Sequence, residues 1–131
     1  AVKMGQDIHF MKKIYLLVVD KIVGNPITTD FEIDAKKRKI VKVIESKTGV
    51  RREFIPIRYY KERTLLKVEI ESATRHELRA LISACGFPIL GDKVYKGKSF
   101  SRLMLRCQKV FINNEWASSL HLYDFIKKAK S

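Results

Sequence analysis

The strongest constraint on the fold is a run of six apolar residues at positions 14–19, Ile-Tyr-Leu-Leu-Val-Val. Its β-branched and aromatic side chains favour a strand, and apolar side chains would point to both faces of that strand. The run therefore predicts a central strand of a sheet that is covered on both sides. It is also far shorter than the roughly 20 residues of a membrane-spanning helix, and Asp20 and Lys21 follow it directly.

Three later segments predict an antiparallel meander. They cover residues 40–44, 50–60 and 64–71, and short polar turns separate them. Parallel pairing would need long crossovers, so short turns indicate antiparallel neighbours. Pro56 lies inside the second segment and is typical of an edge strand or a bulge. The third segment alternates most regularly and would place three apolar residues on one face: Leu66, Val68 and Ile70.

A helix over residues 74–85 is marked at both ends. Thr74 and Glu77 have the spacing of a capping box at its start, whereas Gly86 and Pro88 stop it. Its apolar residues recur at i, i+3, i+4 and i+7, which predicts one buried stripe. This stripe consists of Leu78, Leu81, Ile82 and Cys85.

The remaining segments complete one domain. We expect a short extended piece at residues 28–34, a strand at 103–112 and a closing helix at 122–129. No repeat, low-complexity tract or linker divides the 131 residues. The sequence thus predicts an α+β domain with a mixed, mainly antiparallel sheet and flanking helices. We divide it into a lead-in (1–11), a core (12–112) and a C-terminal segment (113–131).

The charge of the chain indicates its class of partner. Lys and Arg number 27 against 14 Asp and Glu, which gives a net charge of +13. Such an excess favours nucleic acid, whose phosphates Lys and Arg neutralise, and secondly an anionic membrane surface. Two cysteines make no disulfide framework, and three widely spaced histidines make no zinc motif, so we expect no metal and a reduced, cytoplasmic setting.

Two arginines on the predicted helix are the first candidate site residues. Arg75 and Arg79 lie four residues apart on one side of the helix, where like charges repel by a few tenths of a kcal/mol. They form either a solvated basic face or, at Arg79, a site for a phosphate or a buried carboxylate. Two other residues have simpler interpretations: His76 as a solvent-facing residue of the first turn and Asp92, which follows a glycine, as a turn former.

Aromatic and basic residues elsewhere leave similar alternatives. Tyr15 is either a core tyrosine or a ring that stacks on a nucleobase. A short basic run usually faces solvent, but the large net charge of the chain makes a contact with phosphate more expected for the run at 36–39. This run consists of Lys36, Lys37, Arg38 and Lys39. From residue types alone, the sequence indicates a basic nucleic-acid-binding domain.

The order of the segments resembles that of the RluA-like RNA pseudouridine synthases. Residues 72–79, Ser-Ala-Thr-Arg-His-Glu-Leu-Arg, resemble the family's TGRxHQxR element, and residues 86–95 resemble its G-x-P-I-x-G-D-x-x-Y element. Upstream, residues 13–18 are similar to the family's K-x-Y-x-x-x-V strand. Residues 103–107 stand where an R-L-x-L-H-A pattern is usual. The resemblance covers residues 12–112 in the right order.

This resemblance implies an isomerisation of uridine to pseudouridine in RNA that needs no cofactor. The target uridine is flipped out, its glycosidic bond is cleaved with help from an aspartate, and the base is rejoined through carbon 5. By the same resemblance, Tyr15 matches the active-site tyrosine, Arg79 the arginine that pairs with the catalytic aspartate, and Leu78 the apolar residue beside the base. Arg75 and the basic run at 36–39 are the candidate RNA-binding residues.

The sequence also departs from the family pattern. The catalytic aspartate of the family lies in an H-R-L-D element upstream of the tyrosine strand, and nothing before Tyr15 resembles it. Within the helix element, Thr74 and Glu77 replace an arginine and a glutamine. We therefore expect the C-terminal part of a synthase that is inactive alone and acts, when complete, on rRNA or tRNA. The alternative is a non-catalytic RNA-binding protein on the same fold.

Overall fold

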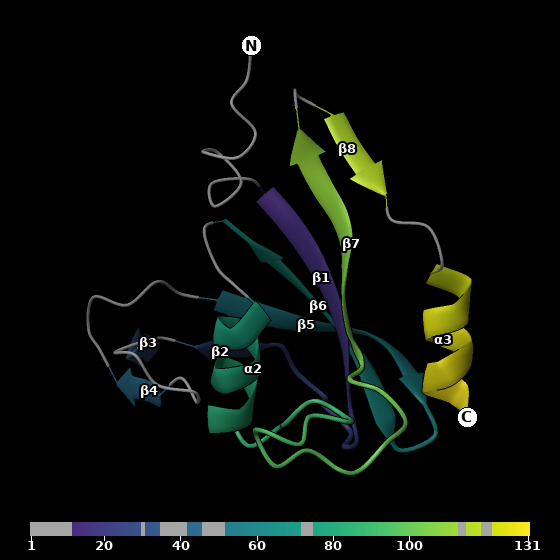
Figure 1. The fold of residues 1–131 in the computed structure, drawn as a ribbon, viewed down its shortest axis with the longest axis horizontal. Helices are drawn as coiled ribbons and strands as arrows, with labels where there is room; N and C mark the ends of the chain where they lie inside the picture. The colour runs from purple at the N-terminus through teal and green to yellow at the C-terminus, as the bar shows by residue number, and fades with distance from the viewer. Residues whose placement is uncertain are drawn as a thin grey trace.

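A computed structural model of the chain describes residues 12–29, 31–34, 42–45, 52–71, 75–112, 115–118 and 122–131. Within these ranges, six strands form one antiparallel sheet in the order β2-β5-β6-β1-β7-β8, and two short strands form a second sheet (Figure 1). The strands are β1 (Lys12–Val19), β2 (Ile27–Thr29), β3 (Phe31–Asp34), β4 (Lys42–Glu45), β5 (Arg52–Tyr60), β6 (Arg63–Ile70), β7 (Leu105–Ile112) and β8 (Glu115–Ser118). The helices are α2 (Arg75–Ala84) and α3 (Leu122–Lys130). The α+β class is confirmed.

Strand β1 is the central strand that the sequence predicted. It pairs with β6 on one side and β7 on the other, and its residues from Tyr15 to Val19 are all buried. Burial of both faces explains why the run is apolar throughout instead of alternating. Val68 and Leu66 lie opposite Tyr15 and Leu17, so the alternating strand supplies the same core.

Strand β5 carries the irregularity expected from its proline. The register with β6 shifts between Pro56 and Arg58. Strand β2 pairs only with the first three residues of β5, from Arg52 to Phe54. Pro56 therefore lies beyond the end of β2 and beside the bulge with β6, which are positions where a sheet tolerates proline.

Two expectations for the strands were wrong, and one strand was not predicted. Strand β4, expected at 40–44, pairs with β3 and not with β5, so the predicted three-stranded meander is reduced to the β5–β6 hairpin. The extended piece at 28–34 splits between two sheets, as β2 and β3. Short polar turns fix antiparallel direction but not the choice of neighbour, and four-residue strands carry little pattern. Strand β8 was not predicted, because its four residues also carry little pattern.

Helix α2 begins and ends within one residue of its predicted bounds. Leu78, Leu81 and Ile82 are buried as the stripe requires, whereas Cys85 is half-buried. At its end, the Gly86 N–H donates to the Ser83 carbonyl (3.0 Å) and the Phe87 N–H to that of Ile82 (3.1 Å). These two bonds define a Schellman motif, with Gly86 at a φ of 89°. Thr74, the expected cap at the start, lies outside the described residues.

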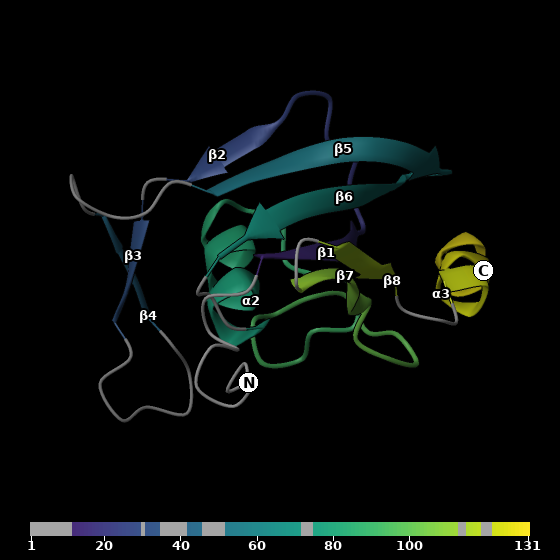
Figure 2. The same cartoon turned by 90° about the horizontal axis from the view of Figure 1, so that it is seen from above.

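The two helices lie at opposite ends of the molecule (Figures 1 and 2). Helix α2 neighbours the β3–β4 pair, and α3 adds its buried Phe125 and Ala129 to the core. Arg102 lies over the Phe125 ring, 6.0 Å from its centroid. The closing helix predicted from the sequence is thus confirmed as a packed element.

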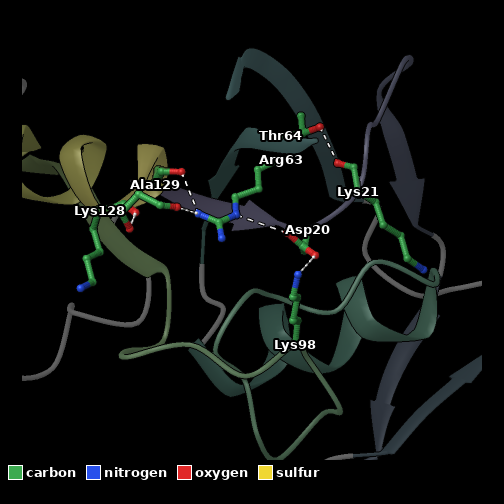
Figure 3. A network of polar contacts seen from close by, with 8 residues as sticks. Asp20, Lys21, Arg63, Thr64, Lys98, Lys128 and Ala129 are labelled. Atoms are coloured by element: carbon green, nitrogen blue, oxygen red, sulfur yellow. Dashed lines mark hydrogen bonds and ion pairs between the residues drawn. The ribbon is translucent and has the colours of Figure 1, made fainter. Parts of the chain in front are cut away.

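Arg63 of the sheet is hydrogen-bonded to the end of α3 (Figure 3). Its Nη1 donates to the Ala129 and Ser131 carbonyls (3.1 and 2.7 Å), and its Nε donates to Asp20 Oδ1 (3.3 Å). One guanidinium therefore satisfies carbonyls at the end of α3, which have no partner inside the helix.

We expect Arg63→Met to lower the free energy of unfolding by about 1–2 kcal/mol, because charged hydrogen bonds are lost at a largely buried site. Thermal or urea unfolding measures this change. Lys12→Met is the matched control, since Lys12 forms an exposed ion pair with Glu71 (3.8 Å) that is worth little. Equal effects of the two substitutions would contradict the role assigned to Arg63.

Candidate functional site

The best-defined polar contact of the described residues joins α2 to the loop that follows it. Arg79 Nε donates to Asp92 Oδ2 (2.9 Å), and Arg79 Nη2 donates to Asp92 Oδ1 (2.8 Å). The Asp92 side chain is fully buried, and that of Arg79 is 14% exposed. This pair is bidentate, and the bond to Asp92 raises the pKa of the Arg79 guanidinium further.

Additional contacts orient both partners of this ion pair. The Tyr95 N–H donates to Asp92 Oδ1 (3.3 Å), and the Arg79 guanidinium lies over the Tyr95 ring at 5.4 Å. The Gly97 N–H donates to the Asp92 carbonyl (2.7 Å), which closes the loop on itself. Asp92 is the turn former that the sequence predicted, and it is also the buried carboxylate offered there as one partner for Arg79.

The loop that carries Asp92 is hydrogen-bonded to the central strand. The Leu90 N–H donates to the Val18 carbonyl (2.8 Å), and the Met104 N–H donates to the Leu90 carbonyl (2.9 Å). Ile89 forms an isolated bridge with Val19. Strand β1 thus holds Tyr15 and, three residues further on, the loop that fixes Arg79.

Gly91 is required for this arrangement. Its φ is 86°, and a Cβ at this position would lie 1.9 Å from the Arg102 carbonyl oxygen. Only glycine combines this backbone conformation with so close an approach. The glycine before Asp92 therefore allows the loop to pack against the chain that leads into β7.

Tyr15 lies in the middle of β1, opposite Cys107 of β7, and is 4% exposed. Burial raises the pKa of the Tyr15 phenol, the Cys107 thiol raises it further, and the Arg75 guanidinium lowers it. Arg75 also reaches the Leu105 carbonyl at 3.5 Å. Tyr15 and Arg75, chosen separately from the sequence, therefore lie close together.

The raised pKa of Tyr15 predicts a loss of stability at alkaline pH. The folded protein holds the phenolic proton more tightly than the unfolded chain does, so this contribution is complete below pH 10.0, the ordinary pKa, and is lost as the pH rises through the folded pKa. We expect Tyr15→Phe to reduce the dependence of unfolding on pH above 10. Tyr123→Phe is the control because Tyr123 is 76% exposed. An unchanged dependence in Tyr15→Phe would contradict this prediction.

The other predicted residues divide into three groups. Leu78 is fully buried in the core cluster that also includes Tyr15. Arg75 and His76 are exposed on the first turn of α2, so the solvated face considered for both arginines holds for Arg75 and is wrong for Arg79. The basic run at 36–39 lies outside the described residues. The sequence singled out Asp92 only as a turn residue, and its position beside Gly91 gave no sign that Arg79 would reach it.

The described part of the chain contains no group of three or more His, Cys, Asp and Glu side chains that could hold a metal ion. Neither α2 nor α3 has the length and apolar character of a membrane-spanning helix. The remaining candidate is the cluster around Tyr15 and Arg79.

Comparison with solved structures identifies the fold. The chain superposes on human RNA Pseudouridylate Synthase Domain Containing 1 with a TM-score of 0.66 and 17% identity, over 89% of this chain and 56% of that one. The architecture is therefore that of a pseudouridine synthase domain.

Curated relatives agree with this fold. A Helicobacter pylori protein named as an uncharacterized RNA pseudouridine synthase is 32% identical over an alignment of 108 residues, and the match covers 76% of this chain and 43% of that protein. An Aquifex aeolicus protein of the same name is 34% identical over 92 residues, or 70% and 27% of the two chains. No protein-family model matches. The chain belongs to an RNA pseudouridine synthase family, and it spans less than half the length of these two relatives.

Proposed function

We propose that this chain is the C-terminal part of the catalytic domain of an RNA pseudouridine synthase that converts uridine to pseudouridine in structured RNA, either rRNA or tRNA. The complete protein would work in the cytoplasm and without a cofactor. The observation that carries this proposal is the pairing of Arg79 with Asp92 beside the strand of Tyr15, in a chain whose relatives bear the synthase name.

The buried residues would contribute to this reaction by holding the base and a catalytic carboxylate in place. The isomerisation breaks the bond between N1 of the base and the ribose and forms the bond between C5 and the ribose. C5 loses its proton and N1 gains one, so the composition is unchanged. Tyr15, which is 4% exposed, would pack on the base, and Leu78, which has no exposed surface, would support this side of the site from the core. Arg79, whose Nε and Nη2 are occupied by Asp92, would offer its remaining N–H groups to a catalytic carboxylate supplied by the segment that precedes β1 in the complete protein.

The test is the release of tritium from RNA labelled at C5 of uridine. We expect the complete protein to release tritium from rRNA or tRNA transcripts at an enzyme-like rate, and the 131-residue chain alone to release none. The intact mass of the natural protein, compared with 15.2 kDa, shows whether a further segment is present to supply the aspartate. An enzyme-like rate from the chain alone would contradict the need for that segment.

A non-catalytic RNA-binding protein is the second candidate, favoured by the net charge of +13. It predicts RNA binding that weakens steeply with salt, and no tritium release from any RNA. A natural protein of 15.2 kDa without activity would support this candidate over the enzyme.

A further inference from the structure

A hollow of about 350 Å³ opens where the turn between β5 and β6, the loop after α2 and the end of α3 meet (Figure 3). Asp20 lines its floor, five residues after Tyr15 on the same stretch of chain. At the rise of a strand, this separation is about 17 Å. The hollow is therefore separate from Tyr15, whereas the loop that carries Asp92 borders it, since the Gly91 N–H donates to the carbonyl of the lining residue Lys98 (2.8 Å).

Positive charge dominates the lining of this hollow. Its cationic residues come from three distant segments: Lys61, Arg63, Lys98 and Lys130. Asp20 and Glu62 are the carboxylate side chains of the lining. Asp20 is shared by Arg63 (3.3 Å) and Lys98 (3.2 Å). Among the described residues, Lys61 and Lys130 have no ion pair, so their ammonium groups give the hollow a net positive potential.

Aromatic rings lie under several of these cations. Lys130 Nζ is 5.9 Å from the Tyr60 centroid. The Phe100 ring has Arg63 at 4.9 Å and Lys128 at 5.6 Å. Cation–π contacts of this kind restrict long side chains that would otherwise sample many rotamers. The basic groups around the hollow are thus partly ordered before any ligand arrives.

Lys61 occupies a backbone position that suits glycine. Its φ is 56°, in the left-handed region, and it lies in the two-residue turn between the paired residues Tyr60 and Arg63. A side chain in this region costs free energy that glycine would avoid. Lysine is therefore less stable than glycine at this position. Strained residues of this kind cluster at functional sites.

We propose that this hollow binds the phosphodiester backbone of RNA, away from the nucleotide at the Tyr15 site. Net positive charge drawn from three segments complements the phosphates of RNA, and the cation–π contacts of Arg63 and Lys130 hold these cations beside the hollow. The proposal takes RNA as the partner from the proposed function, but it requires binding only and no catalysis.

The decisive variant is Lys61→Gly, measured by the affinity for a fluorescent single-stranded RNA at several salt concentrations. Loss of one phosphate contact reduces the slope of log K against log salt by about 0.7, which is about a fivefold weaker affinity at 0.1 M salt. We expect the combination with Lys130→Gln to weaken binding about 25-fold. Because glycine suits the turn, the unfolding temperature of Lys61→Gly should stay the same or rise, so misfolding cannot account for the loss.

Lys12→Gln is the matched control. It removes the same charge near the other end of β1, where Lys12 is already paired with Glu71. We expect it to change the affinity less than twofold. Unchanged RNA affinity in Lys61→Gly would overturn the proposal. An equal loss of affinity in Lys12→Gln would also overturn it and would show that binding responds to net charge alone. Loss of binding in Lys61→Gly, with no tritium release by the complete protein, would retain the hollow and overturn only the synthase.

Discussion

Arg79→Met in the complete protein should lower pseudouridine formation by about 10²–10³-fold, the effect of removing one preorganised donor from an active site. RNA affinity should change little, because Arg79 is largely buried and contributes little to the charged surface. Tritium release and RNA binding, measured on the same preparation, separate these two effects.

Arg79→Met also lowers stability, and a second variant separates this effect from the loss of activity. Arg79→Met leaves the Asp92 carboxylate buried and unpaired, which costs about 3–5 kcal/mol of stability. Adding Asp92→Asn removes that charge and keeps an oxygen that accepts the Tyr95 N–H. We expect the double variant to regain most of the lost stability and none of the lost activity. Activity that returned together with stability would show that Arg79 has only a structural role.

The second large effect is expected at Gly91. Gly91→Ala should lower the free energy of unfolding by about 3 kcal/mol or more, since it combines backbone strain with a steric clash. The φ of 86° disfavours any side chain, and the new Cβ would lie 1.9 Å from the Arg102 carbonyl oxygen. That oxygen belongs to the backbone and cannot rotate away. Urea unfolding measures the change.

Three other glycines separate the two causes. Gly86 has a φ of 89° but open space around it, so Gly86→Ala should cost about 1 kcal/mol. Gly97→Ala introduces a contact of 2.0 Å with the Ile89 carbonyl oxygen without a positive φ. Gly24 has neither problem, and Gly24→Ala should stay within about 0.5 kcal/mol. Equal stabilities of Gly91→Ala and Gly86→Ala would show that the loop yields to the clash.

The sequence predicted the elements whose local signals agree. Strand β1 has an apolar run with no polar alternative, and α2 has a complete stripe and a glycine at its end. The pairing of β3 with β4 could not be predicted, because strands of four residues carry too little pattern to choose a partner. Local pattern determines what an element is, whereas its neighbour depends on the packing of the whole chain.

The same limit applies to the site. The residues offered as candidates included Tyr15 and Arg79, and the two alternatives for Arg79 included a buried carboxylate. Which carboxylate it binds depends on a loop that returns to β1 through the bonds of Leu90. Thirteen residues separate Arg79 from Asp92, and no periodicity relates positions across such a loop. The hollow beside α3 escaped notice because its lysines are scattered along the sequence.

The central position of β1 has a consequence for synthesis of the protein. Strand β1 is the first of these strands to leave the ribosome, yet Tyr15 pairs with Val68 and with Cys107, which is 92 residues later. At about 5–20 residues per second, an apolar strand waits roughly 5–20 s for its last neighbour. The edge of β1 that awaits β7 can pair with other chains throughout this interval, and the opposite edge can do so until β6 has been made. Nascent chains that stop before β7 should therefore depend on chaperones, and the completed sheet should end that dependence.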